Sequence, residues 1–187
     1  MTMTPDLSAP GPLAESAAAK LSLAVPCARL SLRARGAAVA PLSAALGLTL
    51  PERIGTRAST AAGDTEALRL GPDEWVLHAT PAALPGLLAA CAALSPEHPH
   101  SAVDISGREL TLVLEGPRAA ELLTLGMPRD PDSIAPGEGR RTLFDGVSVV
   151  LWREADTRFR MDIWHSFAPH LASLLATGCA ELAAETA

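Results

Sequence analysis

Two stretches of the chain, about eighty residues apart, share one order of apolar and polar positions. In the first stretch, apolar and polar residues alternate over 30–35, a glycine follows, and a short helical pattern ends at Gly47. In the second, a strand-like run over 110–115 is also followed by a glycine and then by a helical face that ends at Gly126. Alternation with a period of two is typical of a strand, and apolar residues spaced three or four apart indicate a helix. The pattern therefore predicts a strand–helix unit that occurs twice.

Each stretch continues into further strands and a second amphipathic helix. The apolar positions of these two helices have the spacing of one buried stripe: Leu84, Leu87, Leu88 and Cys91 in the first, and Phe167, Leu171, Leu174 and Leu175 in the second. The doubled βα…ββα unit predicts an α+β fold with a pseudo-twofold repeat in one compact body. The residues expected in a common core are Leu30, Leu32, Leu110, Leu112 and Leu114.

The same patterns divide the chain into five parts. Residues 1–26 are rich in Pro, Ala, Ser and Thr without sustained periodicity, and are expected to form a flexible N-terminal arm with a short helical stretch around 13–21. The parts that follow are a first α+β half at 27–94, a linker at 95–101, a second α+β half at 102–178 and a C-terminal tail at 179–187.

Within the halves, the expected elements follow from periodicity and from turn residues. In the first half these are strands at 29–35, 55–60, 66–70 and 75–79 and helices at 37–46 and 81–93. In the second half they are strands at 102–106, 108–115, 147–153 and 158–164, a helix after Pro117, a polar stretch at 128–139 and a last helix from Ser166 to Gly178.

Composition narrows the classes of function. The 187 residues carry a formal net charge of −6, which argues against a nucleic-acid binder with its basic footprint. No run approaches the roughly 18 apolar residues that a membrane helix requires, so the cytoplasm is the expected location and no membrane partner is expected. Aromatic residues make up 3% of the chain and Tyr is absent, so only Trp75, Trp152, Trp164 and the three Phe can anchor an interface or stack on a base.

No set of residues adds up to a catalytic or metal site. The three cysteines are far apart without a CxxC pair, and Cys91 and Cys179 are expected to be small core residues. His98 and His100 lack a third ligand nearby. Asp, Ser and His occur without a Ser in a G-x-S-x-G turn. We therefore expect no catalytic residue and no tightly bound flavin or metal in this chain.

Four residues are candidates for contact with a partner. Asp104, Ser106 and Arg108 alternate along one extended segment, which places them on one side. That side is either a solvated strand face or a polar contact strip for a partner or an anionic ligand. Trp75 follows a tight turn with two acidic residues beside it, and is a candidate anchor at the same interface.

Several motifs, in order over residues 27–176, resemble the gamma subunit of heterotetrameric sarcosine oxidase. They are Gly71-Pro72-Asp73-Glu74-Trp75, Ser101-Ala102-Val103-Asp104-Ile105-Ser106 with Arg108, Glu115-Gly116-Pro117-Arg118-Ala119, Leu125-Gly126-Met127-Pro128-Arg129-Asp130, Pro136-Gly137 with Arg141-Thr142, and His165-Ser166-Phe167-Ala168. The chain departs from the family at Met127, where Cys is usual, and at His165-Ser166, where Arg-Ser is usual. The resemblance implies the folate-binding type of fold seen in aminomethyltransferases.

The resemblance also implies a role. It indicates an accessory gamma subunit that supports the oxidative demethylation of sarcosine to glycine, and so a place in sarcosine catabolism and one-carbon metabolism. Its implied partners are the alpha, beta and delta subunits, with FAD, FMN and NAD in the alpha and beta subunits, tetrahydrofolate in the alpha subunit and zinc in the delta subunit. The alternative is a stand-alone folate-binding or aminomethyl-transfer protein, which needs an acidic residue and stacking aromatic side chains for the pterin; the low aromatic content weakens this alternative.

Overall fold

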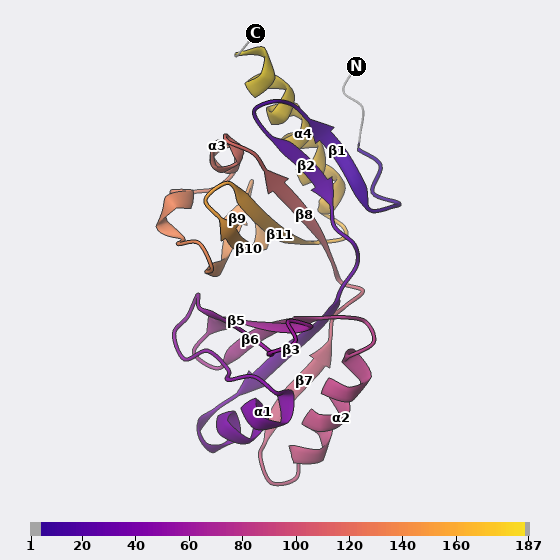
Figure 1. Cartoon of the computed structure of the whole chain (residues 1–187), viewed down its shortest axis with the longest axis vertical. Helices are drawn as coiled ribbons and strands as arrows, with labels where there is room; N and C mark the ends of the chain where they lie inside the picture. Colours follow the sequence, from indigo (N-terminus) through magenta and orange to yellow (C-terminus); the bar gives the residue numbers. More distant parts are fainter. Residues whose placement is uncertain (1–4, 186–187) are drawn as a thin grey trace. The chain divides into compact units, whose positions relative to one another are not determined.

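The computed structural model describes residues 5–185, so residues 1–4 of the expected arm and 186–187 of the expected tail lie outside it. The chain divides into two units (Figure 1). Unit 1 joins the N-terminal residues up to Pro26 to the stretch from Arg108 onward, and unit 2 is Cys27–Gly107. Both units combine an antiparallel sheet with helices, which confirms a fold of mixed helices and strands.

Unit 2 contains a five-stranded antiparallel sheet in the order β4-β5-β6-β3-β7. Its elements are β3 (Ala28–Ala34), a 3-10 turn η1 (Gly36–Ala38), α1 (Val39–Leu46), β4 (Arg57–Ser59), β5 (Thr65–Gly71), β6 (Glu74–Ala79), α2 (Leu84–Leu94) and β7 (His100–Asp104). Alternate residues of β3 and β6 pack against α1 and α2, as the period of a strand requires. The core of unit 2 includes Leu30, Leu32, Leu42, Leu46, Trp75, Leu77 and Cys91.

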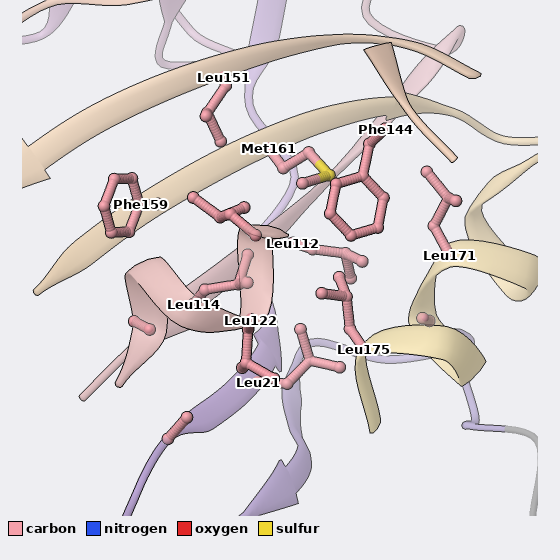
Figure 2. Close-up of a cluster of buried hydrophobic side chains, with 14 of the residues drawn as sticks. Leu21, Leu112, Leu114, Leu122, Phe144, Leu151, Phe159, Met161, Leu171 and Leu175 are labelled. Carbon is pink, nitrogen blue, oxygen red and sulfur yellow. The ribbon is translucent and has the colours of Figure 1, made fainter. Parts of the chain in front are cut away.

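Unit 1 contains a six-stranded antiparallel sheet in the order β1-β2-β8-β11-β10-β9. Its elements are β1 (Gly11–Glu15), β2 (Lys20–Leu23), β8 (Glu109–Glu115), α3 (Ala119–Thr124), a 3-10 turn η2 (Pro131–Ser133), β9 (Gly139–Phe144), β10 (Val147–Ala155), β11 (Arg158–Trp164) and α4 (Ala168–Ala184). One face of this sheet packs against α3 and α4 (Figure 2). The labelled core residues are Leu21, Leu112, Leu114, Leu122, Phe144, Leu151, Phe159, Met161, Leu171 and Leu175.

Two segments of the expected N-terminal arm are strands of this sheet. Residues 11–15 and 20–23 form the hairpin β1–β2 in place of the short helix expected at 13–21. β2 pairs with β8, and its Leu21 and Leu23 are buried in the core of unit 1. The prediction of a flexible arm is wrong because strands of four and five residues are too short to show a period. Their pairing partner also lies far along the chain.

The boundary between the expected halves is also displaced. β7 pairs with β3 of unit 2, so the residues up to Gly107, including 102–107, belong with the first half. The expected linker at 95–101 is instead the turn after α2 and the start of β7. At the other end, α4 continues through Gly178 to Ala184, so most of the expected tail is helix. A helical glycine lowers helix propensity by about 1 kcal/mol, which packing on the core of unit 1 overrides.

The expected common core is divided between the units. Leu30 and Leu32 belong to the core of unit 2, whereas Leu112 and Leu114 belong to that of unit 1. The burial expected for Cys91 and Cys179 is confirmed, and burial raises the pKa of both thiols. Phe167 is 43% exposed, contrary to its place in the expected stripe, because it precedes α4 and does not share the helical period.

Candidate interaction surface

Trp75 lies in the core of unit 2. Its side chain is 1% exposed, and its indole Nε1 donates a hydrogen bond to the carbonyl oxygen of Pro51 at 3.0 Å. The guanidinium carbon of Arg69 lies 4.8 Å from the centre of its ring. Trp75 stands opposite Leu32 in the pairing of β3 with β6. The prediction that it presents an interface anchor is therefore replaced by a structural role.

Ion pairs between Asp73 and two arginines stabilise the turn before Trp75. The carboxylate of Asp73 accepts hydrogen bonds at 2.8 Å from Arg35 Nε and at 2.8 Å from Arg33 Nη2. These two bonds, that of Arg35 first, hold the pKa of Asp73 below its ordinary value. Asp73 thus ties the β5–β6 turn to the end of β3, and it does not stand free beside the tryptophan.

Asp73→Asn is expected to reduce the acid sensitivity of unit 2. A carboxylate whose pKa is lowered in the folded state contributes stability above its unfolded pKa of about 3.9, and that contribution is lost as the pH falls through the lowered pKa. The variant should therefore be less stable than the parent at pH 7, and the difference should shrink as the pH falls below about 4. Urea midpoints of both proteins at several pH values between neutral and strongly acidic provide the measurement. An unchanged difference at all pH values would contradict the role of the two arginines.

Asp104 and Ser106 lie together, but not on a strand face. β7 ends at Asp104, whose Oδ1 accepts hydrogen bonds from the Ser106 backbone N–H at 2.9 Å and from its hydroxyl at 2.6 Å. These bonds lower the pKa of Asp104. The hydroxyl of Ser106 in turn accepts a hydrogen bond from the backbone N–H of Arg29 at 2.9 Å. The two residues close a local turn and join it to β3, so the extended segment expected to continue to Arg108 ends here.

Arg108 opens unit 1, directly before β8. Its Nε and Nη2 donate to Oε1 of Glu109 at 3.1 and 2.7 Å, and its backbone oxygen accepts from the N–H of His165 at 3.1 Å. The guanidinium carbon lies 5.3 Å from the centre of the Trp164 ring, within the range of a cation–π contact. Its side chain remains 43% exposed. The structure therefore places Arg108 beside an aromatic ring other than that of Trp75.

Trp164 is exposed, whereas Trp75, which was the expected anchor, and Trp152 are buried. It is the last residue of β11, stands opposite Glu109 of β8 and is 48% exposed. Phe167 follows in the next turn, where its backbone N–H donates to the oxygen of Trp164 at 2.9 Å. Alternation along 158–164 carried the signal, because Trp164 falls in phase with the polar residues of this strand and out of phase with its apolar ones. We refer to Arg108, Trp164 and Phe167 as the Arg108–Trp164 surface.

A buried polar network supports the strands that carry this surface. Asp162 is 2% exposed and accepts hydrogen bonds from the Thr111 hydroxyl at 2.5 Å and from Trp152 Nε1 at 2.6 Å. These bonds join β8, β10 and β11, with Thr111 paired opposite Asp162. Because a buried carboxylate is costly unless its oxygens are satisfied, the network fixes the register of the three strands.

Residues 5–185 contain no group of three or more His, Cys, Asp or Glu placed to hold a metal ion. No helix in this part of the chain is both long and apolar enough to cross a membrane.

Comparison with known proteins places the chain in a family. A curated relative, the sarcosine oxidase subunit gamma of Corynebacterium sp. (strain U-96), is 33% identical over 147 residues, which cover 78% of this chain and 70% of that protein. The chain belongs to the sarcosine oxidase gamma subunit family. A second gamma subunit, from Arthrobacter sp., is 32% identical over 149 residues, 79% of this chain and 72% of that protein. The resemblance found in the motifs is thus confirmed, although no protein-family model matches the chain.

Solved structures agree with this gamma-subunit assignment. The heterotetrameric sarcosine oxidase from Corynebacterium sp. U-96, in complex with pyrrole 2-carboxylate, contains a chain that matches with a TM-score of 0.79 and 31% identity, covering 91% of this chain and 88% of that one. The glycine cleavage system aminomethyltransferase T from Bartonella henselae matches with a TM-score of 0.67 and 19% identity, covering 85% of this chain and 45% of that one. The second likeness shows a shared fold, as the sequence resemblance implied.

Proposed function

We propose that this chain is the gamma subunit of a heterotetrameric sarcosine oxidase, and that it supports the oxidative demethylation of sarcosine to glycine without contributing catalytic residues. The observation that carries this proposal is the similarity to curated gamma subunits, together with a fold match over 91% of the chain to a protein from the assembled enzyme. The role belongs to sarcosine catabolism and to one-carbon metabolism in the cytoplasm.

The partners proposed for the chain are the alpha, beta and delta subunits. FAD, FMN, NAD and tetrahydrofolate are assigned to those partners, and no residue of this chain is assigned to them. Support for several subunits comes from a solved relative that is itself heterotetrameric. The alternative, a stand-alone folate-binding or aminomethyl-transfer protein, is not favoured, because the aminomethyltransferase likeness is one of fold and this chain spans 45% of that protein.

We also infer that the two units repeat one topology. In unit 2 the sheet runs β4-β5-β6-β3-β7, and in unit 1 the order β9-β10-β11-β8-β2 matches it strand for strand, with β1 added at the edge. Each unit has one strand, a helix, three strands and a second helix in sequence. The fifth strands are exchanged, since β2 precedes β3 in the chain but pairs with β8, and β7 precedes β8 but pairs with β3. This supports the predicted repeat, while the twofold relation stays a prediction.

The Arg108–Trp164 surface is the proposed contact with a partner subunit. It consists of the half-exposed guanidinium of Arg108 and two large aromatic side chains, Trp164 and Phe167, which are 48% and 43% exposed. Arg, Trp and other aromatic residues are the types most enriched at the centre of protein interfaces. Asp104 and Ser106 belong to unit 2 and hydrogen-bond to each other within a turn. Their contact with a partner subunit stays a prediction.

Trp164→Ala and Arg108→Ala are expected to weaken assembly with the partner subunits. Truncation of an interface anchor costs about 1–3 kcal/mol, or about fivefold to 150-fold in affinity. The measurement is the recovery of the complex and its sarcosine oxidase activity after co-expression of each variant with the partner subunits.

A matched control is available within unit 1. Arg158 is also 43% exposed and also donates to a glutamate, Glu115, at 2.8 Å. Arg158→Ala should assemble as the parent does, because an exposed ion pair contributes little. Recovery of active complex at the parental level for both Trp164→Ala and Arg108→Ala would place the interface elsewhere. Failure of the parent chain to co-purify with any partner subunit would refute the proposed function itself.

A further inference from the structure

A cavity of about 560 Å³ lies in unit 1, at β9, the edge strand opposite β1 in the six-stranded sheet. Its walls come from two stretches, residues 127–129 and 133–134 around η2, and residues 140–143 of β9 with Ser148 of β10. The volume falls within the range of about 300–1,000 Å³ that is typical of small-molecule sites. The sequence motifs contain part of the lining, residues 127–129 and 141–142, and the Arg108–Trp164 surface contains none of it.

One part of the lining is apolar. Met127, Pro128 and Ile134 come from the first stretch, and Leu143 of β9 comes from the second. Leu143 is 47% exposed, so its side chain is accessible to a molecule in the cavity. This part of the cavity is suited to the apolar body of a ligand.

The other part of the lining is cationic. Three arginines, Arg129, Arg140 and Arg141, contribute to the cavity in a chain whose net charge is −6. Arg140 Nη2 donates to the backbone oxygen of Ser133 at 3.2 Å, which fixes the guanidinium between the two walls. Its buried Nε has no hydrogen-bond acceptor among the described residues, and Glu138 Oε2 lies 4.0 Å from Nη2, at the outer limit of an ion pair.

We propose that this cavity binds a small organic carboxylate with an apolar body. An arginine held in place beside an apolar wall suits a carboxylate, because a guanidinium forms charge-assisted hydrogen bonds to carboxylate oxygens. The hydroxyls of Ser133, Thr142 and Ser148 supply further polar contacts at the same site. The carboxylate would face Arg140 and Arg129, and the apolar body would lie against Met127 and Leu143.

The test uses 2-naphthoate as the probe and 2-naphthamide as its uncharged counterpart. Titration calorimetry of the full chain should show saturable binding of one naphthoate, with the amide at least about tenfold weaker because it lacks the charge-assisted hydrogen bonds. Arg140→Gln should weaken naphthoate binding about tenfold or more. Arg129→Gln should also weaken it, and because Arg129 is exposed, this variant tests the site without a risk to folding. Arg158→Gln, a half-exposed arginine outside the cavity, should bind as the parent does.

Four outcomes would overturn the proposal. The first is no saturable binding of naphthoate to the parent. The second is equal affinity for acid and amide. The third is parental affinity in both Arg140→Gln and Arg129→Gln. The fourth is binding to the free chain that is lost in the complex with the partner subunits, which would assign the cavity to an acidic segment of a partner. Each outcome leaves the gamma-subunit function intact, because co-purification tests that separately.

Discussion

Trp75→Ala is expected to lower the free energy of unfolding by about 3–5 kcal/mol, the usual cost of removing a buried aromatic side chain. The indole of Trp75 is 1% exposed and fills the core of unit 2 beside Leu32 and Leu77. Its removal leaves a cavity and also leaves the Pro51 oxygen without the hydrogen bond from Nε1. Urea unfolding, followed together with hydrogen exchange of the β3 and β6 amides, measures the loss.

Trp164→Ala provides the matched control, because it makes the same substitution on another strand. Trp164 is 48% exposed, so its truncation should change the stability of the isolated chain by less than about 1 kcal/mol. The two variants should therefore separate folding from assembly: Trp75→Ala impairs folding, and Trp164→Ala impairs recovery of the complex. Equal stability of the two variants would contradict the placement of both indoles.

The contrast between these tryptophans shows what local pattern can establish. The strands predicted at 29–35, 108–115 and 158–164 lie close to β3, β8 and β11, because alternation along a half-buried strand is visible in seven residues. The face on which each side chain lies follows from the same alternation. Whether a tryptophan is exposed also depends on what packs over its strand. Trp75 was expected at the surface, but it is buried in the core of unit 2, which also contains residues of α1 and α2.

Pairing between distant segments was beyond the reach of the pattern. β9 was missed because Arg140 to Leu143 carry no alternation of apolar and polar types; this strand follows the polar stretch expected at 128–139. Periodicity does not reveal the exchange of β2 and β7 between the units. The strand β2 directly precedes β3 in the chain but pairs with β8, and β7 directly precedes β8 but pairs with β3. The cavity was missed for the same reason, because its arginines come from a loop and a strand that only the fold brings together. The family, by contrast, was identified from ordered motifs alone.

Gly116→Ala is expected to destabilise unit 1 by about 2–4 kcal/mol, through backbone strain and close contact together. Gly116 follows β8 with φ at 129°, in a region that side-chain-bearing residues rarely adopt. A Cβ there would lie 2.9 Å from the backbone oxygen of Ala18 and 2.9 Å from the Cα of Ala19, in the turn of the β1–β2 hairpin. Because both neighbours are backbone atoms, the hairpin itself must move.

The displacement should be local and measurable. Ala18 also accepts a hydrogen bond from the backbone N–H of Arg118 at 3.0 Å, so movement of the hairpin turn breaks its link to the start of α3. Hydrogen exchange over residues 11–23 should therefore accelerate more than exchange over β10, and the urea midpoint should fall. Gly86→Ala is the control: Gly86 lies in α2, a Cβ added there would have no neighbour within 4 Å, and the substitution should raise stability by up to about 1 kcal/mol. If exchange over residues 11–23 were the same in Gly116→Ala as in the parent, the close approach of Gly116 to the turn of the β1–β2 hairpin would be contradicted.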